Sequence, residues 1–392
     1  MPSSTEQRGA PARSDDPLAI EAAETIVLQA SVADRNMQNP VLRAETRGGR
    51  IATLVRLRTA SGLTGECYTL ALGVETKALV DAIDKVCQTV VGRSAAEPEA
   101  RWAEMFEHTR RAFFARGTFT RAIACVDGAI WDLVGKSRQQ PLHQVWGGDR
   151  KDMPVVVLAM SWRGDAPDVE FAQAIERLRA DGIGGCKFKV GPQSPLGIEG
   201  DAARMKLARE VGGPDFIILA DANQGWSLED ATRFAALVEP LDLDWIEEPC
   251  HWEDDRALLA ELRSRTCVPV CAGQMEITSQ ACRDLIASRS VDVCNFDATF
   301  GGGPTPWRRV AATAADHGVT MVQHLQPQIG MQLTASVRDG AHLEIYEPAA
   351  DPYFFEMVTN RPAFRNGRCV VSREPGWGLA LDEAFIASHR IN

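Results

Sequence analysis

Two short motifs in the middle of the chain carry side chains whose types and spacing could move a proton. Lys187-Phe188-Lys189 and Asp221-Ala222-Asn223-Gln224 each close an apolar run. Side chains alternate between the two faces of a strand, so the two lysines share one face, and Asp221 and Asn223 share another. Two amines beside a carboxylate and an amide, on neighbouring strand ends, indicate a proton-transfer site next to a metal ion. Charged strand edges without chemistry are the alternative.

The order of apolar and polar stretches indicates which elements position these motifs. After residue 150, short apolar runs alternate with stretches long enough for a helix and two loops. Eight strands with intervening helices are typical of a (β/α)₈ barrel. An open doubly wound sheet would need a glycine-rich phosphate loop after its first strand, and Ser161-Trp162-Arg163-Gly164 is not one. The expected strands are 155–160, 185–190, 216–221, 244–247, 268–272, 291–297, 319–324 and 343–346.

The first 150 residues indicate a separate α+β domain. Residues 1–20 are small and polar, which predicts a disordered tail. An antiparallel hairpin is expected to turn at Ser61-Gly62. Strands are expected over 22–30 and 51–59, and helices over 77–91, 98–116 and 119–135, the last ending at Gly135. The expected division is a tail (1–20), an α+β domain (21–150), a barrel (151–355) and a C-terminal segment (356–392) that packs on the first domain.

Composition excludes several classes of partner. The chain of 392 residues is 45% hydrophobic and 24% charged, which is ordinary for a globular enzyme. Its formal charge of -11 argues against nucleic-acid binding. The sequence has no apolar run of membrane-spanning length and no secretory signal at its N-terminus. Ten scattered cysteines suit a reducing compartment, so we expect a cytoplasmic protein with no membrane partner. An anionic ligand would then be attracted by a metal or by buried lysines.

Polar residues at the ends of the expected strands define a candidate metal site. In barrel enzymes the chemistry lies at the carboxyl ends of the strands. Asp221, Glu247 and Gln274 close three consecutive strands, so they can converge on one hard cation. Oxygen ligands of this kind suit Mg²⁺. An ordinary acidic turn at Glu247-Glu248-Pro249 is the alternative.

A second group of polar residues lies on the other side of the expected barrel mouth. Lys189 would face His324 across the mouth, and Asp297, on the adjacent strand, can accept a hydrogen bond from the imidazole and make it more basic. Glu344 ends the last strand. Taken singly, His324 could be a core histidine and Glu344 a solvated strand end. Because all these groups occur at strand ends, the joint pattern favours a site.

These motifs resemble the mandelate racemase subgroup of the enolase superfamily. The resemblance runs from Gly62-Leu63-Thr64-Gly65-Glu66 through Ala129-Ile130-Trp131-Asp132-Leu133-Val134-Gly135-Lys136 to Pro375-Gly376-Trp377-Gly378. Its most specific parts are Lys187-Phe188-Lys189, Asp221-Ala222-Asn223, Ile246-Glu247-Glu248-Pro249, the Asp297/His324 pair and Glu344. It implies a modified TIM barrel with an N-terminal capping domain that the C-terminal segment completes. It also implies a Mg²⁺ ion that chelates the substrate carboxylate.

The resemblance also implies roles for the candidate residues. As is general for this superfamily, a Lys or His base works beside Mg²⁺. Lys189 would be the base on one face of the substrate, and His324, paired with Asp297, the acid or base on the other. Lys187 and Mg²⁺ would stabilise the enediolate that forms when the proton alpha to the carboxylate leaves. Glu344 would hydrogen-bond a carboxylate oxygen.

One position departs from the family pattern. The third metal ligand of the family is normally a Glu, and Gln274 occupies that position here. An amide oxygen can bind Mg²⁺, but the site then carries one negative charge fewer. Glu276, two residues on and on the same face of an extended strand, is the alternative third ligand. We interpret Gln274 as the ligand.

Substrate contacts are expected from Asn223, from His251 and from the capping domain. Segments 31–49 and 67–76 are the candidates there, and Trp252 is expected to be a packing residue. Arg43, Arg47 and Arg50 could reach the far end of a polyol or diacid, although solvated surface charge is the alternative for most of them.

Two reactions are compatible with a Lys/His pair, and a protein that binds carboxylates without catalysis is a third possibility. Among the resembling enzymes with this pairing, dehydration of sugar acids to 2-keto-3-deoxy acids is commoner than racemisation. We therefore expect a Mg²⁺-dependent acid-sugar dehydratase, with a racemase or epimerase of a 2-hydroxy or sugar acid as the alternative. A non-catalytic Mg²⁺-dependent carboxylate-binding protein is the alternative of another class. The family also implies a homo-oligomer of even subunit number.

Overall fold

The computed structural model describes residues 15–32, 49–71, 76–158 and 166–392. Most of the tail expected over residues 1–20 lies outside these ranges. The tail prediction is wrong for its last residues, because Ala19 and Ile20 are buried and the Ile20 N–H donates to the Arg93 carbonyl at 2.9 Å. The chain therefore enters its first strand already packed.

A three-stranded antiparallel sheet opens the fold, with the strand order β1-β2-β3. Its strands are β1 (Ile20–Ala30), β2 (Arg50–Thr59) and β3 (Thr64–Ala71). β2 and β3 form the expected hairpin, and Val55 pairs with both Thr25 and Cys67. Gly62 in the turn has a φ of 84°, a conformation that glycine adopts at little cost. This part of the sequence prediction is confirmed.

Helices pack on one face of this sheet, and two of the predicted helix ends are wrong. The helices are α2 (Thr76–Val90), α3 (Pro98–Phe106) and α4 (Arg116–Ser137). The stretch after Phe106 forms two 3₁₀ turns, η3 (Glu107–Arg111) and η4 (Phe113–Ala115), instead of one continuous helix. α4 does not stop at Gly135. A Cβ at Gly135 would lie 2.6 Å from the Gly376 Cα, so this glycine allows two backbones to approach and does not end the helix.

Eight parallel strands form the barrel, and all eight correspond to the predicted runs. They are β4 (Asp152–Leu158), β5 (Gly185–Lys189), β6 (Ile217–Asp221), β7 (Trp245–Glu247), β8 (Val270–Ala272), β9 (Val293–Cys294), β10 (Thr320–Met321) and β11 (Leu343–Tyr346). They pair in chain order from β4 to β10, and β11 pairs with β4. A parallel bridge between Met321 and Gly340 brings β10 close to the start of β11. β9 and β10 are shorter than expected.

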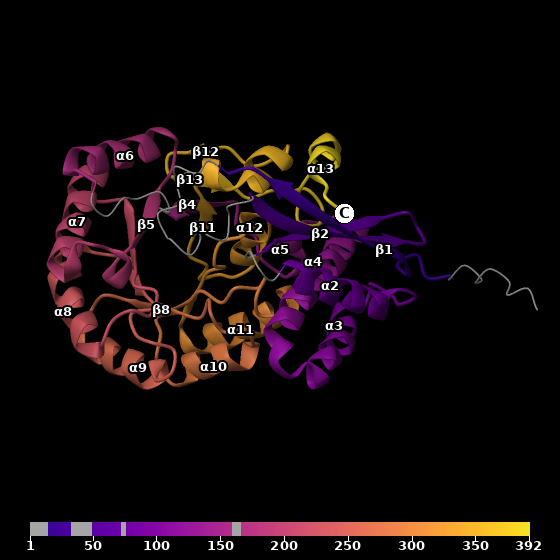
Figure 1. Ribbon diagram of the computed structural model, residues 1–392, viewed down its shortest axis with the longest axis horizontal. Helices are drawn as coiled ribbons and strands as arrows, with labels where there is room; N and C mark the ends of the chain where they lie inside the picture. Colours follow the sequence, from indigo (N-terminus) through magenta and orange to yellow (C-terminus); the bar gives the residue numbers. More distant parts are fainter. Residues whose placement is uncertain (1–14, 33–48, 72–75, 159–165) are drawn as a thin grey trace, which may run out of the picture.

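The barrel helices form an arc around the outside of the strands (Figure 1). They are α6 (Asp168–Ala180), α7 (Gly197–Gly212), α8 (Leu228–Val238), α9 (Asp255–Arg265), α10 (Ser279–Ala287), α11 (Pro304–His317) and α12 (Pro327–Ala335). Shorter helical turns are α5 (Leu142–Val145), η5 (Gly191–Gln193), η6 (Glu239–Leu241), η7 (Pro348–Ala350) and the π-helical η8 (Tyr353–Met357). Inside the barrel, alternate strand residues form a separate apolar cluster: Val156, Leu219, Trp245, Cys271, Val293 and Val322. This cluster supports the strand ends from below.

The C-terminal residues contact both parts of the molecule. β12 (Phe364–Arg365) and β13 (Arg368–Val370) form a small hairpin, and β13 pairs antiparallel with the first residues of β4. α13 (Glu383–His389) lies beside β1, where the Ile391 N–H donates to the Val27 carbonyl at 2.9 Å. The end of the chain therefore lies on the first sheet (Figure 1).

Buried hydrogen bonds hold the first helices against the barrel. Asp127 on α4 accepts from the backbone N–H of Thr305 at 2.8 Å and from its hydroxyl at 2.9 Å. The Trp131 indole also donates to the Thr305 hydroxyl at 2.9 Å, and the Trp102 indole donates to the Gly302 carbonyl at 2.8 Å. These contacts fix the N-terminus of α11 and the loop that leads to it from β9. Within the described ranges, no helix is long and apolar enough to cross a membrane.

Candidate active site

A buried lysine joins two carboxylates at the centre of the barrel mouth. The Lys187 Nζ lies 2.8 Å from the Glu247 Oε1 and 2.6 Å from the Glu344 Oε1. Burial lowers the pKa of Lys187, but the charges of Glu247 and Glu344 outweigh burial, so its pKa lies well above the ordinary value. Lys187 is therefore an ammonium ion held inside the protein by two carboxylates.

The second lysine of the motif reaches a different carboxylate. The Lys189 Nζ lies 2.5 Å from the Asp221 Oδ2, and the Lys189 side chain is 24% exposed while that of Asp221 is fully buried. The Asp221 Oδ1 accepts from the backbone N–H of Asn223 at 2.9 Å. Although burial opposes ionisation, the charge of Lys189 lowers the pKa of Asp221. Lys189 is thus the lysine that opens toward the solvent side of the site.

His324 and Asp297 form the dyad that the sequence predicts. The His324 Nδ1 lies 2.9 Å from the Asp297 Oδ2. Burial opposes protonation, but the hydrogen bond that His324 donates to Asp297 outweighs it, so the pKa of His324 is raised. The other oxygen of Asp297 accepts from the N–H and hydroxyl of Thr299, each at 2.7 Å, and from the Gln323 amide at 2.8 Å. Sequence reasoning missed these two supporting residues, although Thr299 lies two residues after Asp297 and Gln323 directly before His324.

Glu247 and Glu344 each have one oxygen on Lys187 and one on a second donor. The Glu344 Oε2 accepts from the Leu325 backbone N–H at 2.9 Å, and the Glu247 Oε2 accepts from the Trp245 indole at 3.1 Å. Burial opposes ionisation of Glu344, but Lys187 and His324 together lower its pKa. Because Leu325 directly follows His324, its hydrogen bond to Glu344 brings the dyad beside the Lys187 cluster.

Gln274 and Glu276 point to different partners. Gln274 is buried, its Nε2 donates to the Glu248 Oε2 at 2.9 Å, and its Oε1 has no partner among the described residues. The Glu276 carboxylate instead pairs with the Arg256 guanidinium at 2.8 Å. Burial raises the pKa of Glu248 to about 7, and the charge of Asp221 adds to this effect. The structure therefore brings Gln274, and not Glu276, into contact with the acidic strand ends.

The donor set at these strand ends fits a hard cation. Asp221 is paired in register with Glu247, which is paired with Cys271 on the strand that leads to Gln274. The buried, unpartnered amide oxygen of Gln274 lacks the hydrogen bond or ion that such an atom normally has. Among the residues that the structure describes, no group of three His, Cys, Asp or Glu side chains that could hold a metal is found. The buried amide oxygen of Gln274 is a further oxygen donor beside the Asp221 and Glu247 strand ends.

Five residues with left-handed backbone conformations lie just after these strand ends. Asn223, Gln224, Glu248, Leu325 and Gln326 have positive φ values between 40° and 65°. Such conformations cost free energy for residues other than glycine and concentrate at functional sites. Each of these residues follows β6, β7 or β10. The strain therefore lies where the candidate residues lie.

The residues expected to contact substrate differ in exposure, and some lie outside the described ranges. His251 is exposed on the loop after β7, with its ring 5.5 Å from that of Trp252. Trp252 is 63% exposed, so its prediction as a packing residue is wrong. Arg50 is buried with its guanidinium 4.0 Å above the Tyr346 ring, which makes it part of the packing. Arg43, Arg47, most of segment 31–49 and residues 72–75 lie outside the described ranges.

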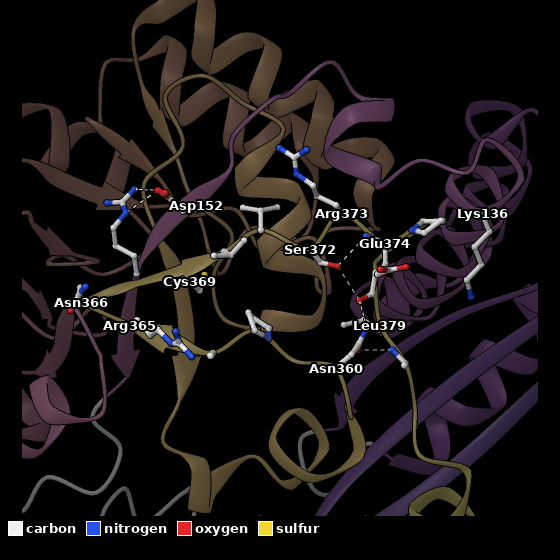
Figure 2. Close-up of a pocket in the computed structure, with 18 residues that line it drawn as sticks. Lys136, Asp152, Asn360, Arg365, Asn366, Cys369, Ser372, Arg373, Glu374 and Leu379 are labelled. Atoms are coloured by element: carbon white, nitrogen blue, oxygen red, sulfur yellow. Dashed lines mark hydrogen bonds and ion pairs between the residues drawn. The ribbon is translucent and has the colours of Figure 1, made fainter.

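A large hollow on the surface is unrelated to this constellation. Figure 2 shows it lined by residues of the C-terminal segment, among them Asn360, Ser372 and Arg373, together with Asp152. Asp152 begins β4 and pairs with β13, so the hollow lies at the amino end of a barrel strand. The candidate residues lie at the carboxyl ends. The hollow contains none of them.

Comparison with known proteins agrees with this fold. The protein-family model described as "Mandelate racemase / muconate lactonizing enzyme, N-terminal domain" matches residues 25–147. The family model described as "Enolase C-terminal domain-like" matches residues 170–385. The chain belongs to the mandelate racemase/muconate lactonizing enzyme family of the enolase superfamily, and it is an enzyme of that superfamily.

Three relatives illustrate the range of this similarity. The 3,6-anhydro-alpha-L-galactonate cycloisomerase of Streptomyces coelicolor is 28% identical, covering 84% of this chain and 88% of that protein. The arabinonate dehydratase of Saccharolobus solfataricus is 26% identical, covering 85% and 89%. The crystal structure of a mandelate racemase/muconate lactonizing enzyme from a marine actinobacterium in complex with magnesium is 35% identical, covers 96% and 100%, and has a TM-score of 0.87.

Proposed function

We propose that this chain is a Mg²⁺-dependent sugar-acid dehydratase that yields 2-keto-3-deoxy acids. The observation that carries the proposal is the arrangement of Lys189 and the His324–Asp297 dyad around the buried Lys187 cluster. Relatives named as dehydratases of arabinonate and of other sugar acids support the class of reaction. The solved relative in complex with magnesium supports the metal.

The metal site would consist of Asp221, Glu247 and Gln274. Their oxygen atoms are the donors that Mg²⁺ prefers, and the buried oxygen of Gln274 has no other partner among the described residues. When bound, the ion supplies positive charge beside the carboxylate of the substrate, where negative charge develops. Asn223 and His251 remain the proposed substrate contacts, and the Lys187 ammonium adds a second positive charge within the protein.

The protein residues would carry out the proton transfers. Lys189, as its neutral amine, removes the hydrogen alpha to the carboxylate, and the electron pair of that C–H bond spreads into the carboxylate as an enediolate. The enediolate electron pair then returns to form a double bond between the alpha and beta carbons, and the bond between the beta carbon and its hydroxyl breaks with its own electron pair leaving on oxygen. Protonated His324 donates the proton that completes a water molecule. The resulting enol tautomerises to the 2-keto-3-deoxy acid. Lys187 stabilises the enediolate, and Glu344 holds Lys187 and faces the carboxylate.

A screen of mono- and diacid sugars for 2-keto acid formation tests this proposal. We expect at least one acid to be converted with Mg²⁺ present and none after chelation of divalent ions. The product class also decides between dehydration and the alternative reaction. An epimer of the starting acid, without loss of water, would identify a racemase or epimerase and overturn the dehydratase proposal.

The pH dependence of Asp297→Asn tests the role of the dyad. The hydrogen bond that His324 donates to the Asp297 carboxylate raises the pKa of His324, so replacing this carboxylate by an amide should lower that pKa. If His324 must be protonated to release water, the alkaline limb of the kcat profile moves to lower pH, and kcat near neutrality falls by about 10²–10⁴-fold. Rates over a series of buffers measure this shift. A uniform loss of rate at every pH, with an unmoved limb, would contradict the assignment.

A further inference from the structure

The hydrogen bond between Gln274 and Glu248 bears on how the Gln274 amide is oriented at the metal site, an inference that rests on the proposed function. A carboxylate offers two equivalent oxygens, whereas an amide has one oxygen that can bind a cation and one nitrogen that only donates. A glutamine ligand must therefore be held with its amide in one of two orientations. A glutamate ligand has no such requirement.

The surroundings of Gln274 allow one orientation only. The side chain is 4% exposed, and its Nε2 lies 2.9 Å from the Glu248 Oε2. An ionised carboxylate only accepts hydrogen bonds, so it must face the nitrogen and leave the oxygen on the other side. The Gln274 backbone is itself fixed, because its N–H donates to the Asn295 Oδ1 at 3.0 Å. The amide oxygen is left buried without a partner in the described part of the chain.

Glu248 is held in place for this contact at a cost in backbone strain. It is 5% exposed and has a φ of 40°, a left-handed conformation that favours glycine. Its backbone N–H donates to the Cys271 carbonyl at 2.8 Å, and the Gln224 amide donates to its Oε2 at 3.3 Å. A glycine would adopt this conformation at a lower cost in free energy. We therefore attribute the presence of glutamate here to the contacts of its side chain.

We propose that Glu248 is a positioning residue for the cation site: its carboxylate orients the Gln274 amide so that Oε1 faces the cation, and it supplies the negative charge that an amide ligand lacks. Glu248 does not itself touch the metal. Its contribution depends on residue 274 being a glutamine, which makes it testable by a double-mutant cycle.

Isothermal titration of the full chain with MgCl₂ at one fixed pH measures the cycle. In the wild-type background, Glu248→Met leaves the Gln274 amide nitrogen buried without an acceptor, and we expect the Mg²⁺ dissociation constant to rise by about tenfold or more. In a Gln274→Glu background the same change leaves no amide nitrogen at residue 274 unpaired, and the Gln224 amide loses its acceptor equally in both backgrounds, so we expect a rise of less than about threefold. An equal factor in the two backgrounds would overturn the proposal.

Two further variants separate the orienting contact from general effects. Glu248→Gln keeps an acceptor oxygen and removes the charge, so its effect should fall between wild type and Glu248→Met. If Glu248→Met lowers the thermal midpoint of unfolding measured without Mg²⁺, its affinity could fall because the fold is damaged, and Glu248→Gln then serves as the test. A Mg²⁺ affinity of Glu248→Gln equal to that of the wild type would overturn the proposal. Glu253→Gln, which removes an exposed carboxylate from the same loop, should leave the affinity unchanged. A wild-type chain that binds no Mg²⁺ would overturn the proposed function as well.

Discussion

Lys189→Ala should abolish exchange of the alpha hydrogen of the substrate with deuterated solvent, while His324→Ala should keep that exchange and lose the elimination of water. The two side chains act on different atoms, because Lys189 takes the alpha proton and His324 delivers a proton to the leaving hydroxyl. Each replacement should lower kcat/KM for dehydration by about 10²–10⁴-fold. Proton NMR of the recovered acid and an assay of the 2-keto product measure the two steps separately.

A lysine far from the site provides the control for this experiment. Lys151 is exposed and directly precedes β4, at the amino end of the barrel strands. Lys151→Ala should retain both exchange and dehydration. Exchange at the wild-type rate in Lys189→Ala would assign the base to another residue. Loss of exchange in His324→Ala would show that proton removal and water elimination are not divided between Lys189 and His324.

Lys187→Met should have the largest effect on stability of any single replacement in the site. The change leaves Glu247 and Glu344 as buried carboxylates without their shared cation, and breaking a buried ion pair in this way costs about 3–5 kcal/mol. The free energy of unfolding, measured by denaturant titration at about pH 8, should fall by that amount, and dehydration should be lost.

The loss should be smaller in acid, because the two carboxyls can then be neutral. Lys187 lowers the pKa of Glu344, so in the wild type the ionised carboxylate stabilises the fold above its unfolded pKa, and this stability is lost as pH falls through the folded pKa. Without Lys187 the pKa of Glu344 should rise, and the variant should lose stability as pH increases. Lys77→Met breaks an exposed pair with Asp81 and should cost no more than about 1 kcal/mol. An equally small effect for Lys187→Met would contradict the role of its buried ion pairs.

The sequence predicts the strand ends well because two simple rules apply there. Residues alternate along each strand, and the carboxyl ends of parallel strands meet at one edge, so Lys187, Asp221 and Glu247 could be placed at one site without any knowledge of their contacts. The dyad of Asp297 and His324 follows from adjacent strands in the same way. The structure brings Lys187 to hydrogen-bond distance of Glu247, and His324 to hydrogen-bond distance of Asp297, while Asp221 pairs with Lys189.

The contacts that support the site could not be predicted, because they depend on backbone conformations without a periodic signal. Glu248 resembles an acidic turn residue in the sequence, and only its left-handed backbone and burial place it against Gln274. Gln323 and Thr299 bind Asp297 from irregular loops. Gly135 resembles a helix stop, whereas its role is contact with Gly376, which is distant in the sequence.

The most direct test of the account is the fate of the alpha hydrogen in deuterated water with the wild-type chain and Mg²⁺ across a panel of sugar acids. The account predicts an acid that loses its alpha hydrogen and gives a 2-keto-3-deoxy product with deuterium on the adjacent carbon. Acids that bind, as shown by calorimetry, yet are recovered without deuterium and without product would contradict it and would indicate a carboxylate-binding protein.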